Sequence, residues 1–299
     1  MEAVMGRTAR AVIACAAIGA AVPAGGVAAH AAPRAVNEYV ALGDSWAADA
    51  TLSQVSTEFV SAGCAQSRNS YAKQVAAALV VPTFRDATCG GATTENMTES
   101  QSVRFGPANP PQFDSLSAAT DLVTLGIGGN DAGLAETVEN CLTANPAVSV
   151  CRDANVSGGV DRMSERIAAA ESKVASVIDG IRARSPRARI LLLDYFEGIG
   201  TSGGCFPMIP ISDADASWLG AKLAELDAML ARVAAAKGVE FVDTYRASGG
   251  HDACQPAGTR WVEGLLPLST DPLGPAVPFH PNQLGADYQA RQVLAALRG

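Results

Sequence analysis

The sequence predicts an α/β fold, with helices on both faces of a parallel β-sheet. Four short aliphatic runs lack the alternation of polar and apolar residues that a half-exposed strand shows, and they occupy residues 39–42, 122–127, 189–195 and 240–242. Between these runs, apolar residues recur at steps of three and four, which indicates amphipathic helices. Because strands and helices alternate, we expect right-handed crossovers, a doubly wound sheet and a ligand site at the carboxyl ends of the strands.

Residues 1–31 have the features of a secretory signal peptide. Arg7 and Arg10 precede an apolar run at residues 11–22, and Ala29-His30-Ala31 follows as a cleavage site. That run is shorter than the ~20 residues that span a bilayer, and no later segment is long and uncharged enough. The segment Val12-Ile13-Ala14-Cys15 resembles a lipoprotein cleavage box, but cleavage there would leave almost no apolar stretch ahead of Cys15. Arg7 and Arg10 are not adjacent, which disfavours the twin-arginine export route. The sequence thus predicts a secreted protein without a stable membrane anchor.

The expected strands and helices follow in chain order. The strand at 39–42 and a helix at 71–79 come first, before the strand at 122–127. Two long helices after it are predicted by apolar residues at Met163, Ile167, Ala170, Val174, Val177 and Ile181, and at Leu219, Leu223, Leu226, Leu230 and Val233. Asp213 and Asp215 lie near the expected start of the second long helix, and Gly238 lies just past its expected end. A terminal helix is expected over residues 284–297.

Composition limits the classes of function that fit one domain over residues 32–299. The net charge is −8 and basic clusters are missing, which argues against nucleic acid as a partner. Two dispersed histidines outside the signal peptide do not form a set of metal ligands. The segment 126–131 lacks the third glycine of a dinucleotide-binding fingerprint. We therefore expect a monomer that holds no metal and needs no cofactor.

Six cysteines remain once Cys15 is removed with the signal peptide. An even number of cysteines in an exported chain predicts disulfides rather than free thiols. Although six cysteines can pair in many ways, each pair of sequence neighbours here flanks a glycine-rich or polar loop. The expected bridges are therefore Cys64–Cys89, Cys141–Cys151 and Cys205–Cys254.

Four short segments offer the groups of an acyl-transfer site. Gly43-Asp44-Ser45-Trp46 directly follows the first expected strand, where a sheet can present a nucleophile. Cys89-Gly90-Gly91, Gly128-Gly129-Asn130-Asp131 and Phe279-His280-Pro281-Asn282 follow in that order. Together the four segments can supply a serine nucleophile, oxyanion donors and a base. Taken singly, the glycine pair and Asn130 could be turn residues, and Asp44 is expected to hold its loop by hydrogen bonds.

The base must be His251 or His280 if residues 1–31 are removed. A lone histidine is more often structural, but a serine hydroxyl group is a weak nucleophile without an adjacent base. His280 lies in a proline-stiffened loop just before the terminal helix, whereas His251 lies beside the expected Cys254 bridge. We therefore predict His280 as the base.

These segments resemble the four conserved blocks of the SGNH, or GDSL, hydrolases, and the resemblance spans almost the whole chain after the signal peptide. It is strongest to secreted actinobacterial lipases and esterases, whose six cysteines pair sequentially. The resemblance implies a flavodoxin-like three-layer sandwich around a five-stranded parallel sheet, and hydrolysis of carboxylic esters through an acyl-enzyme intermediate. By position it implies Ser45 as the nucleophile and His280 as the general base. The implied oxyanion donors are the Ser45 N–H, the Gly90 N–H and the Asn130 side-chain amide.

The chain departs from this family at the third member of the triad. The family often places an aspartate three residues before the histidine, where this chain has Val277. Some similar secreted enzymes orient the imidazole with the main-chain carbonyl at that position, so we predict that the Val277 carbonyl orients His280. Asp271, nine residues upstream of His280, is the alternative. The loss of a carboxylate is tolerable because the third group only orients the ring and stabilises its cationic form.

The sequence leaves the ester substrate open. Trp46 and the apolar loop at 206–211 can line an acyl site, which would favour triglycerides or phospholipids, or can simply pack in the core. Phospholipase A activity and deacetylation of polysaccharides are alternatives on the same site. A non-catalytic module that binds lipid or polysaccharide is a further alternative, and it would not react with a fluorophosphonate.

Overall fold

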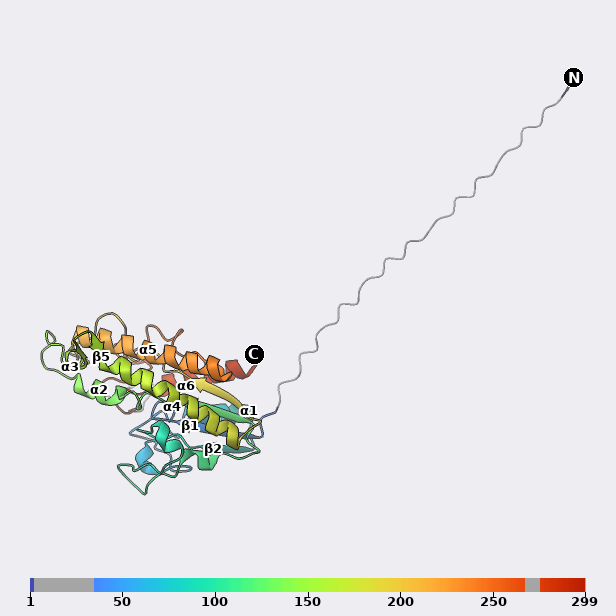
Figure 1. Cartoon of the computed structure of the whole chain (residues 1–299), viewed down its shortest axis with the longest axis horizontal. Coiled ribbons are helices and arrows are strands. Elements are labelled where there is room, and N and C mark those ends of the chain that lie inside the picture. The colour runs from blue at the N-terminus through green and yellow to red at the C-terminus, as the bar shows by residue number, and fades with distance from the viewer. Residues whose placement is uncertain (3–34, 267–274, 299) are drawn as a thin grey trace. The chain divides into compact units, whose positions relative to one another are not determined.

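The computed structural model describes residues 1–2, 35–266 and 275–298 (Figure 1). The described residues from 35 onward group into one compact unit. Nearly all of the predicted signal peptide lies outside the described residues, as does Asp271. No helix in the described part of the chain is both long and apolar enough to cross a membrane.

Five parallel strands form the central sheet, in the spatial order β2-β1-β3-β6-β7. They are β1 (Glu38–Gly43), β2 (Thr83–Asp86), β3 (Leu122–Gly126), β6 (Arg189–Leu193) and β7 (Glu240–Val242), and a separate two-stranded hairpin consists of β4 (Val156–Ser157) and β5 (Val160–Asp161). The chain starts in the middle of the sheet, passes to the β2 edge and then returns to the other side of β1. This is the flavodoxin-like order, in which ligands bind at the switch point between β1 and β3.

Helices cover both faces of the sheet, as predicted for a three-layer sandwich. They are α1 (Tyr71–Leu79), α2 (Leu134–Asn140), α3 (Cys151–Asn155), α4 (Arg162–Arg184), α5 (Asp213–Lys237) and α6 (Gln283–Arg298). Val40 and Leu42 of β1 share one apolar cluster with α4 and α5, which run alongside each other in Figure 1. The intervening Tyr39 and Ala41 share the other cluster with α1 and α6. Successive residues of a strand point to opposite faces, so each strand contributes to two cores.

The long helices begin and end where their sequences supply caps. The Ser212 hydroxyl accepts a hydrogen bond from the Asp215 N–H at 3.1 Å at the start of α5. Gly238 ends α5 with a φ of 58°, in the left-handed region where glycine carries no side-chain penalty. At the start of α4, an Asp161 carboxylate oxygen accepts the Met163 N–H at 2.9 Å. The expected end of the second long helix at Gly238 is thus confirmed.

The edge strand β2 was not among the strands expected from aliphatic runs. Its sequence Thr-Phe-Arg-Asp holds a single apolar residue, so its pairing with β1 decides its conformation. The Phe84 ring packs on Tyr39 with 5.0 Å between ring centroids, and the Arg85 guanidinium pairs with Glu38 of β1. The short helices α2 and α3 were also not expected, and the Cys141–Cys151 bridge joins them.

All three expected disulfides are present: Cys64–Cys89, Cys141–Cys151 and Cys205–Cys254. Short 3₁₀ helices complete the described loops at η1 (Ala62–Cys64), η2 (Thr94–Met97) and η3 (Gln112–Ser115).

Candidate active site

The turn after β1 presents Ser45 at the switch point of the sheet. Gly43 ends the strand, and a Cβ atom there would lie 2.3 Å from the Gly126 carbonyl oxygen of β3. Only glycine fits, since real Cβ atoms do not approach backbone this closely. The buried Gln112 side chain accepts the Gly43 N–H at 2.7 Å and donates to the Gly43 carbonyl at 2.8 Å. Ser45 follows with 8% of its surface exposed.

His280 lies within hydrogen-bond distance of Ser45. Its Nε2 atom is 2.7 Å from the Ser45 Oγ, and its Nδ1 atom is 2.8 Å from the Pro278 carbonyl oxygen. Because a carbonyl oxygen only accepts, the proton of the neutral ring belongs on Nδ1, and Nε2 is free to accept the serine proton. Burial lowers the pKa of His280, while the bond to Pro278 works in the opposite direction. The ring is therefore neutral, and able to act as a base, at neutral pH.

The carbonyl that orients His280 is not the predicted one. The Val277 carbonyl accepts the backbone N–H of His280 at 3.1 Å and so closes a β-turn. The centre of that turn is Pro278, whose φ is fixed by its ring, and Phe279, which has a φ of 60°. This conformation turns the Pro278 carbonyl toward Nδ1. A left-handed residue in the middle of a turn is normally glycine or asparagine, so nothing in the sequence indicates this geometry.

Buried polar groups hold the histidine turn in place. The Glu263 N–H donates to the His280 carbonyl, and the Phe279 N–H donates to the Glu263 carbonyl, both at 3.0 Å. The fully buried Glu263 carboxylate accepts from Arg260 at 2.8 Å and from the Asn282 amide at 3.0 Å. The Asn282 Oδ1 in turn accepts the Leu284 N–H at 2.9 Å at the start of α6.

Asn130 lies beside Ser45 in the wall of a common pocket. Its Nδ2 donates to the Ala92 carbonyl at 2.9 Å, which fixes the side chain and leaves its second N–H for another acceptor. Asp131 ties the same loop to the segment after β2, because its carboxylate accepts the Thr94 N–H at 2.9 Å and the Thr94 hydroxyl at 2.6 Å. The segments around Asn130 and the glycine pair are thus fastened together.

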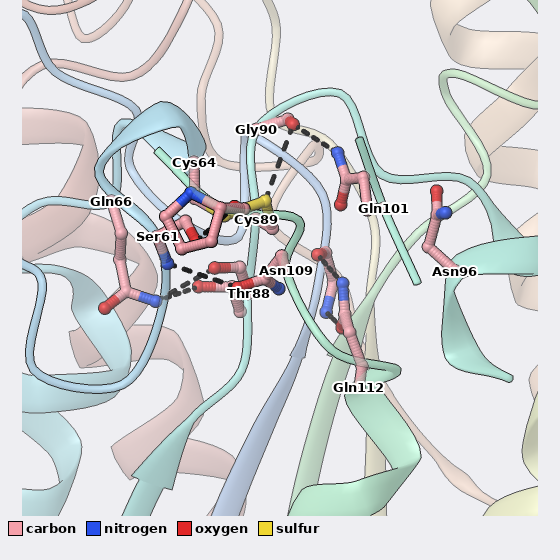
Figure 2. The surroundings of a disulfide bond; sticks show 12 residues. Ser61, Cys64, Gln66, Thr88, Cys89, Gly90, Asn96, Gln101, Asn109 and Gln112 are labelled. Carbon is pink, nitrogen blue, oxygen red and sulfur yellow. Dashed lines mark hydrogen bonds between the residues drawn. A yellow bond between two sulfur atoms is a disulfide. The ribbon is translucent and has the colours of Figure 1, made fainter. Parts of the chain in front are cut away.

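The structure does not support Gly90 as an oxyanion donor. Its N–H is already donated to the Cys64 carbonyl at 2.9 Å, next to the Cys64–Cys89 bridge. Figure 2 shows the Gly90 carbonyl facing the Gln101 side chain, which donates to it at 2.7 Å. The next glycine, Gly91, has a φ of 76°, and its N–H donates to no other described residue. In the pair Gly90-Gly91, the second glycine is therefore the one with a free donor, which the sequence alone did not distinguish.

Asp44 and Tyr195 lie beneath the serine turn. The Tyr195 hydroxyl donates to the Asp44 Oδ2 at 2.5 Å, and the Trp46 N–H donates to the Asp44 Oδ1 at 2.9 Å. Burial raises the pKa of Asp44 to about 6, against the opposing effect of these donors. Asp44 thus holds its loop by hydrogen bonds, and no pattern in the sequence indicates its partner Tyr195.

An apolar pocket opens beside Ser45 and His280. Trp46, Ile209 and Ile211 line it, so part of the apolar loop considered from the sequence does reach the site. Further apolar walls come from α2 and α5 and from the loop after β6, through Leu134, Val138, Ile199, Leu219 and Leu223. A pocket with this apolar lining fits the hydrocarbon part of a ligand.

His251 is placed apart from this site. Its ring stacks on Trp261 with 3.8 Å between centroids and an interplanar angle of 3°. Its Nδ1 atom is 2.7 Å from the Thr259 carbonyl oxygen. Within the ranges that the structure covers, no cluster of three or more His, Cys, Asp or Glu side chains could hold a metal ion.

Comparison with known proteins agrees with this geometry. A model of the GDSL-like lipase/acylhydrolase family matches residues 41–288. Lipase 2 of Streptomyces coelicolor is 34% identical over 283 residues, which cover 90% of each chain. The lipase of Streptomyces rimosus is 28% identical over 263 residues, which cover 87% of each chain.

Two solved structures show the same fold. The extracellular lipase of Streptomyces rimosus gives a TM-score of 0.64 at 26% identity and covers 88% of this chain and 98% of its own. Phospholipase A1 of Streptomyces albidoflavus gives a TM-score of 0.61 at 24% identity and covers 88% of this chain and 99% of its own. This chain therefore belongs to the GDSL-like lipase/acylhydrolase family and is a carboxylic ester hydrolase.

Proposed function

We propose that this protein is a secreted serine esterase or lipase that hydrolyses esters of apolar acyl chains, such as acyl glycerides, through an acyl-enzyme on Ser45. The observation that carries the proposal is the 2.7 Å contact between Ser45 Oγ and His280 Nε2 at the wall of an apolar pocket. A serine beside a neutral, oriented imidazole is an activated nucleophile. The apolar pocket beside this nucleophile can bind the hydrocarbon chain of an ester substrate.

In the first half of the reaction, the Ser45 oxygen bonds to the ester carbonyl carbon while His280 Nε2 takes the hydroxyl proton. The carbonyl oxygen becomes an oxyanion, and fixed N–H donors stabilise it. We assign this role to the N–H groups of Ser45 and Gly91, neither of which donates to another described residue, and to the second N–H of Asn130 Nδ2. The bond to the leaving oxygen then breaks, and His280 returns the proton to the alcohol.

Water completes the reaction by attacking the acyl-enzyme, with His280 again removing a proton. The bond between the acyl carbon and the Ser45 oxygen then breaks, His280 returns the proton to that oxygen, and the fatty acid leaves. Throughout, the Nδ1–H of His280 donates to the Pro278 carbonyl, which keeps Nε2 directed at Ser45. A neutral carbonyl stabilises the cationic ring less than a carboxylate does, while it fixes the tautomer equally well.

A series of p-nitrophenyl esters of increasing acyl length, with triacylglycerol, phosphatidylcholine and acetylated xylan, tests the proposal. We expect kcat/KM to rise with chain length up to the capacity of the pocket, and expect little release of acetate from xylan. Val138→Trp should narrow the pocket and shift the preference to short chains. The control Val148→Trp, at an exposed position outside the pocket lining, should not. A preference for acetyl esters in the unaltered protein would contradict an acyl-chain substrate.

Secretion of a monomer is part of the same proposal. Support comes from the predicted signal peptide at residues 1–31 and from the three disulfides, which persist in oxidising compartments. Protein recovered from the culture medium should begin after Ala31 and elute as a monomer. An uncleaved N-terminus on cell-bound protein would contradict secretion without affecting the catalytic assignment.

A further inference from the structure

We propose that Tyr195 is a positioning residue of the active site, because its hydroxyl group joins the loop that carries Ser45 to the loop that carries Asn130. This inference rests on the proposed function. Tyr195 lies two residues beyond the end of β6 and is 4% exposed. Strand β6 therefore fixes its position, between the loop after β1 and the loop after β3.

The Tyr195 hydroxyl group makes one hydrogen bond in each direction. It accepts the Gly129 N–H at 2.9 Å and donates to Asp44 Oδ2 at 2.5 Å. A backbone N–H can only donate, so the hydroxyl proton is available to Asp44. A Cβ atom on Gly129 would lie 3.1 Å from the same hydroxyl, so the glycine of the Gly128-Gly129-Asn130 segment permits this approach.

Both partners are immediate neighbours of reacting groups. Gly129 precedes Asn130, the proposed oxyanion donor, and Asp44 precedes Ser45. Asp44 Oδ1 also accepts the N–H of Trp46 at 2.9 Å. One oxygen of the carboxylate therefore binds Tyr195, and the other binds the residue that follows Ser45. A shift of the tyrosine would move the nucleophile and the oxyanion hole relative to each other. Misplacement by about 1 Å can cost on the order of 10²-fold in rate.

The bond between Tyr195 and Asp44 is strongest when Asp44 is ionised. Burial and the negative charge of Asp44 raise the pKa of Tyr195 well above its usual value, so the hydroxyl stays protonated. Burial raises the pKa of Asp44 to about 6, and the Tyr195 bond lowers it. Two more carboxylates face this pair, Asp131 from the loop after β3 and Asp227 from α5, which accepts the Tyr195 backbone N–H at 3.0 Å. Tyr71 also interacts electrostatically with Asp44, and His280 is bonded to Ser45 next to Asp44.

The test compares Tyr195→Phe with Tyr288→Phe. Tyr288 is also buried, at 3% exposure, and its hydroxyl makes one bond of 2.8 Å, to the Thr244 carbonyl, outside the site. Both variants should lose some thermal stability. Only Tyr195→Phe should lower kcat, by roughly 10- to 10²-fold with KM nearly unchanged. It should also move the acid limb of the pH profile upward, because Asp44 loses a donor that lowers its pKa.

A second variant, Asp44→Asn, replaces the carboxylate at the other end of the same hydrogen bond and should also lower kcat with KM nearly unchanged, so the inference stays testable if Tyr195→Phe folds poorly. Because both residues act through one hydrogen bond, the double variant should be little worse than the poorer single one. Additive losses, or a Tyr195→Phe enzyme with the kcat and pH profile of Tyr288→Phe, would overturn the inference. Failure of the unaltered protein to react with a fluorophosphonate at Ser45 would instead overturn the proposed function, so the two failures are distinguishable.

Discussion

The two sides of the active site are held by different kinds of structure. Ser45 and Asn130 lie in tight turns at the ends of the adjacent central strands β1 and β3, which pair from Tyr39–Leu122 to Gly43–Gly126. His280 lies in a turn outside any helix or strand, between an isolated bridge and α6. Buried polar groups of the segment 260–263 hold that turn.

This difference predicts different consequences of mutation. The strand side is part of the sheet core, so its loops cannot move without disturbing the main-chain pairing of β1 with β3. The histidine side depends on a few side chains whose removal leaves the sheet intact. The chemistry needs both sides, so removing Ser45 or His280 should cost about equally. Substitutions of the residues that support the histidine turn should mainly lower stability and the precision of its placement.

The largest effect should follow removal of the nucleophile. Ser45→Ala should lower kcat by on the order of 10⁶-fold, as loss of the serine does in a protease. A fluorophosphonate should attach one adduct to the unaltered protein, on the peptide that contains Ser45, and none to the variant. Ser56→Ala, at another buried serine, should retain both activity and labelling. An adduct mapped to a different serine would remove the basis of the comparison.

The next effect concerns the oxyanion hole. Asn130→Ala should lower kcat by roughly 10²- to 10³-fold, because one donor to the developing charge is lost. Asn109 offers a matched control, since it is buried and its side chain accepts the Ser61 N–H at 3.2 Å away from the site. Asn109→Ala should lose stability and keep most of its activity. Equal activity in the two variants would argue against an oxyanion role for Asn130.

On the histidine side, the main effect should be on stability. Glu263→Ala leaves the Arg260 guanidinium buried without its carboxylate, which typically costs about 3–5 kcal/mol. The control Glu240→Ala breaks a pair with Arg189 in which both side chains are over 40% exposed, and should cost less than about 1 kcal/mol. Urea unfolding measures both. Similar losses in the two variants would mean that the buried network does not hold the turn.

The strand side was largely predictable from sequence, and the reason is local. A buried parallel strand needs a continuous aliphatic run, and the Gly-Asp-Ser and Gly-Gly-Asn segments follow such runs directly. The exception on the sheet is β2, whose four residues form a strand because β1 pairs with them. The sequence pattern also could not choose between Gly90 and Gly91, because the Cys64 carbonyl that engages Gly90 lies 26 residues earlier in the chain.

The histidine side was predictable in its residue and not in its geometry. His280 followed from the small number of histidines, whereas the Val277 carbonyl was chosen from the resemblance to secreted enzymes that use the carbonyl at that position. The φ of 60° at Phe279 turns the next carbonyl, that of Pro278, toward the ring instead. Tyr195 was placed in an expected strand, and no pattern in the sequence indicates that its hydroxyl reaches Asp44.

The pH dependence of kcat/KM should reflect the ionisation of two groups, His280 and Asp44. The base must be neutral, and burial lowers the pKa of His280, so its contribution to the acid limb should fall below pH 6.5. The bond from Tyr195 is strongest when Asp44 is ionised, and burial raises the pKa of Asp44 to about 6, so activity should also fall as the pH falls through that value. Measured kcat/KM should therefore stay constant from pH 8 down to about 6.5 and then decline. A limb centred above pH 7 would contradict a buried neutral imidazole.

The smallest effect should come from Val277, the residue that was predicted from sequence as the third member of the triad. The Val277 carbonyl accepts the His280 N–H, and the Val277 N–H donates to the Ala50 carbonyl at 2.9 Å. Both bonds survive truncation of the side chain, so Val277→Ala should change kcat by less than about threefold. Val277→Asp restores the carboxylate that the family often has there, but Nδ1 already donates to Pro278, so no gain in kcat is expected. A rise of tenfold or more in Val277→Asp, with the melting temperature unchanged, would show that the turn can present a side chain to the ring. The backbone of the turn would then not be the only group that can orient the His280 ring, contrary to the description of the histidine side given above.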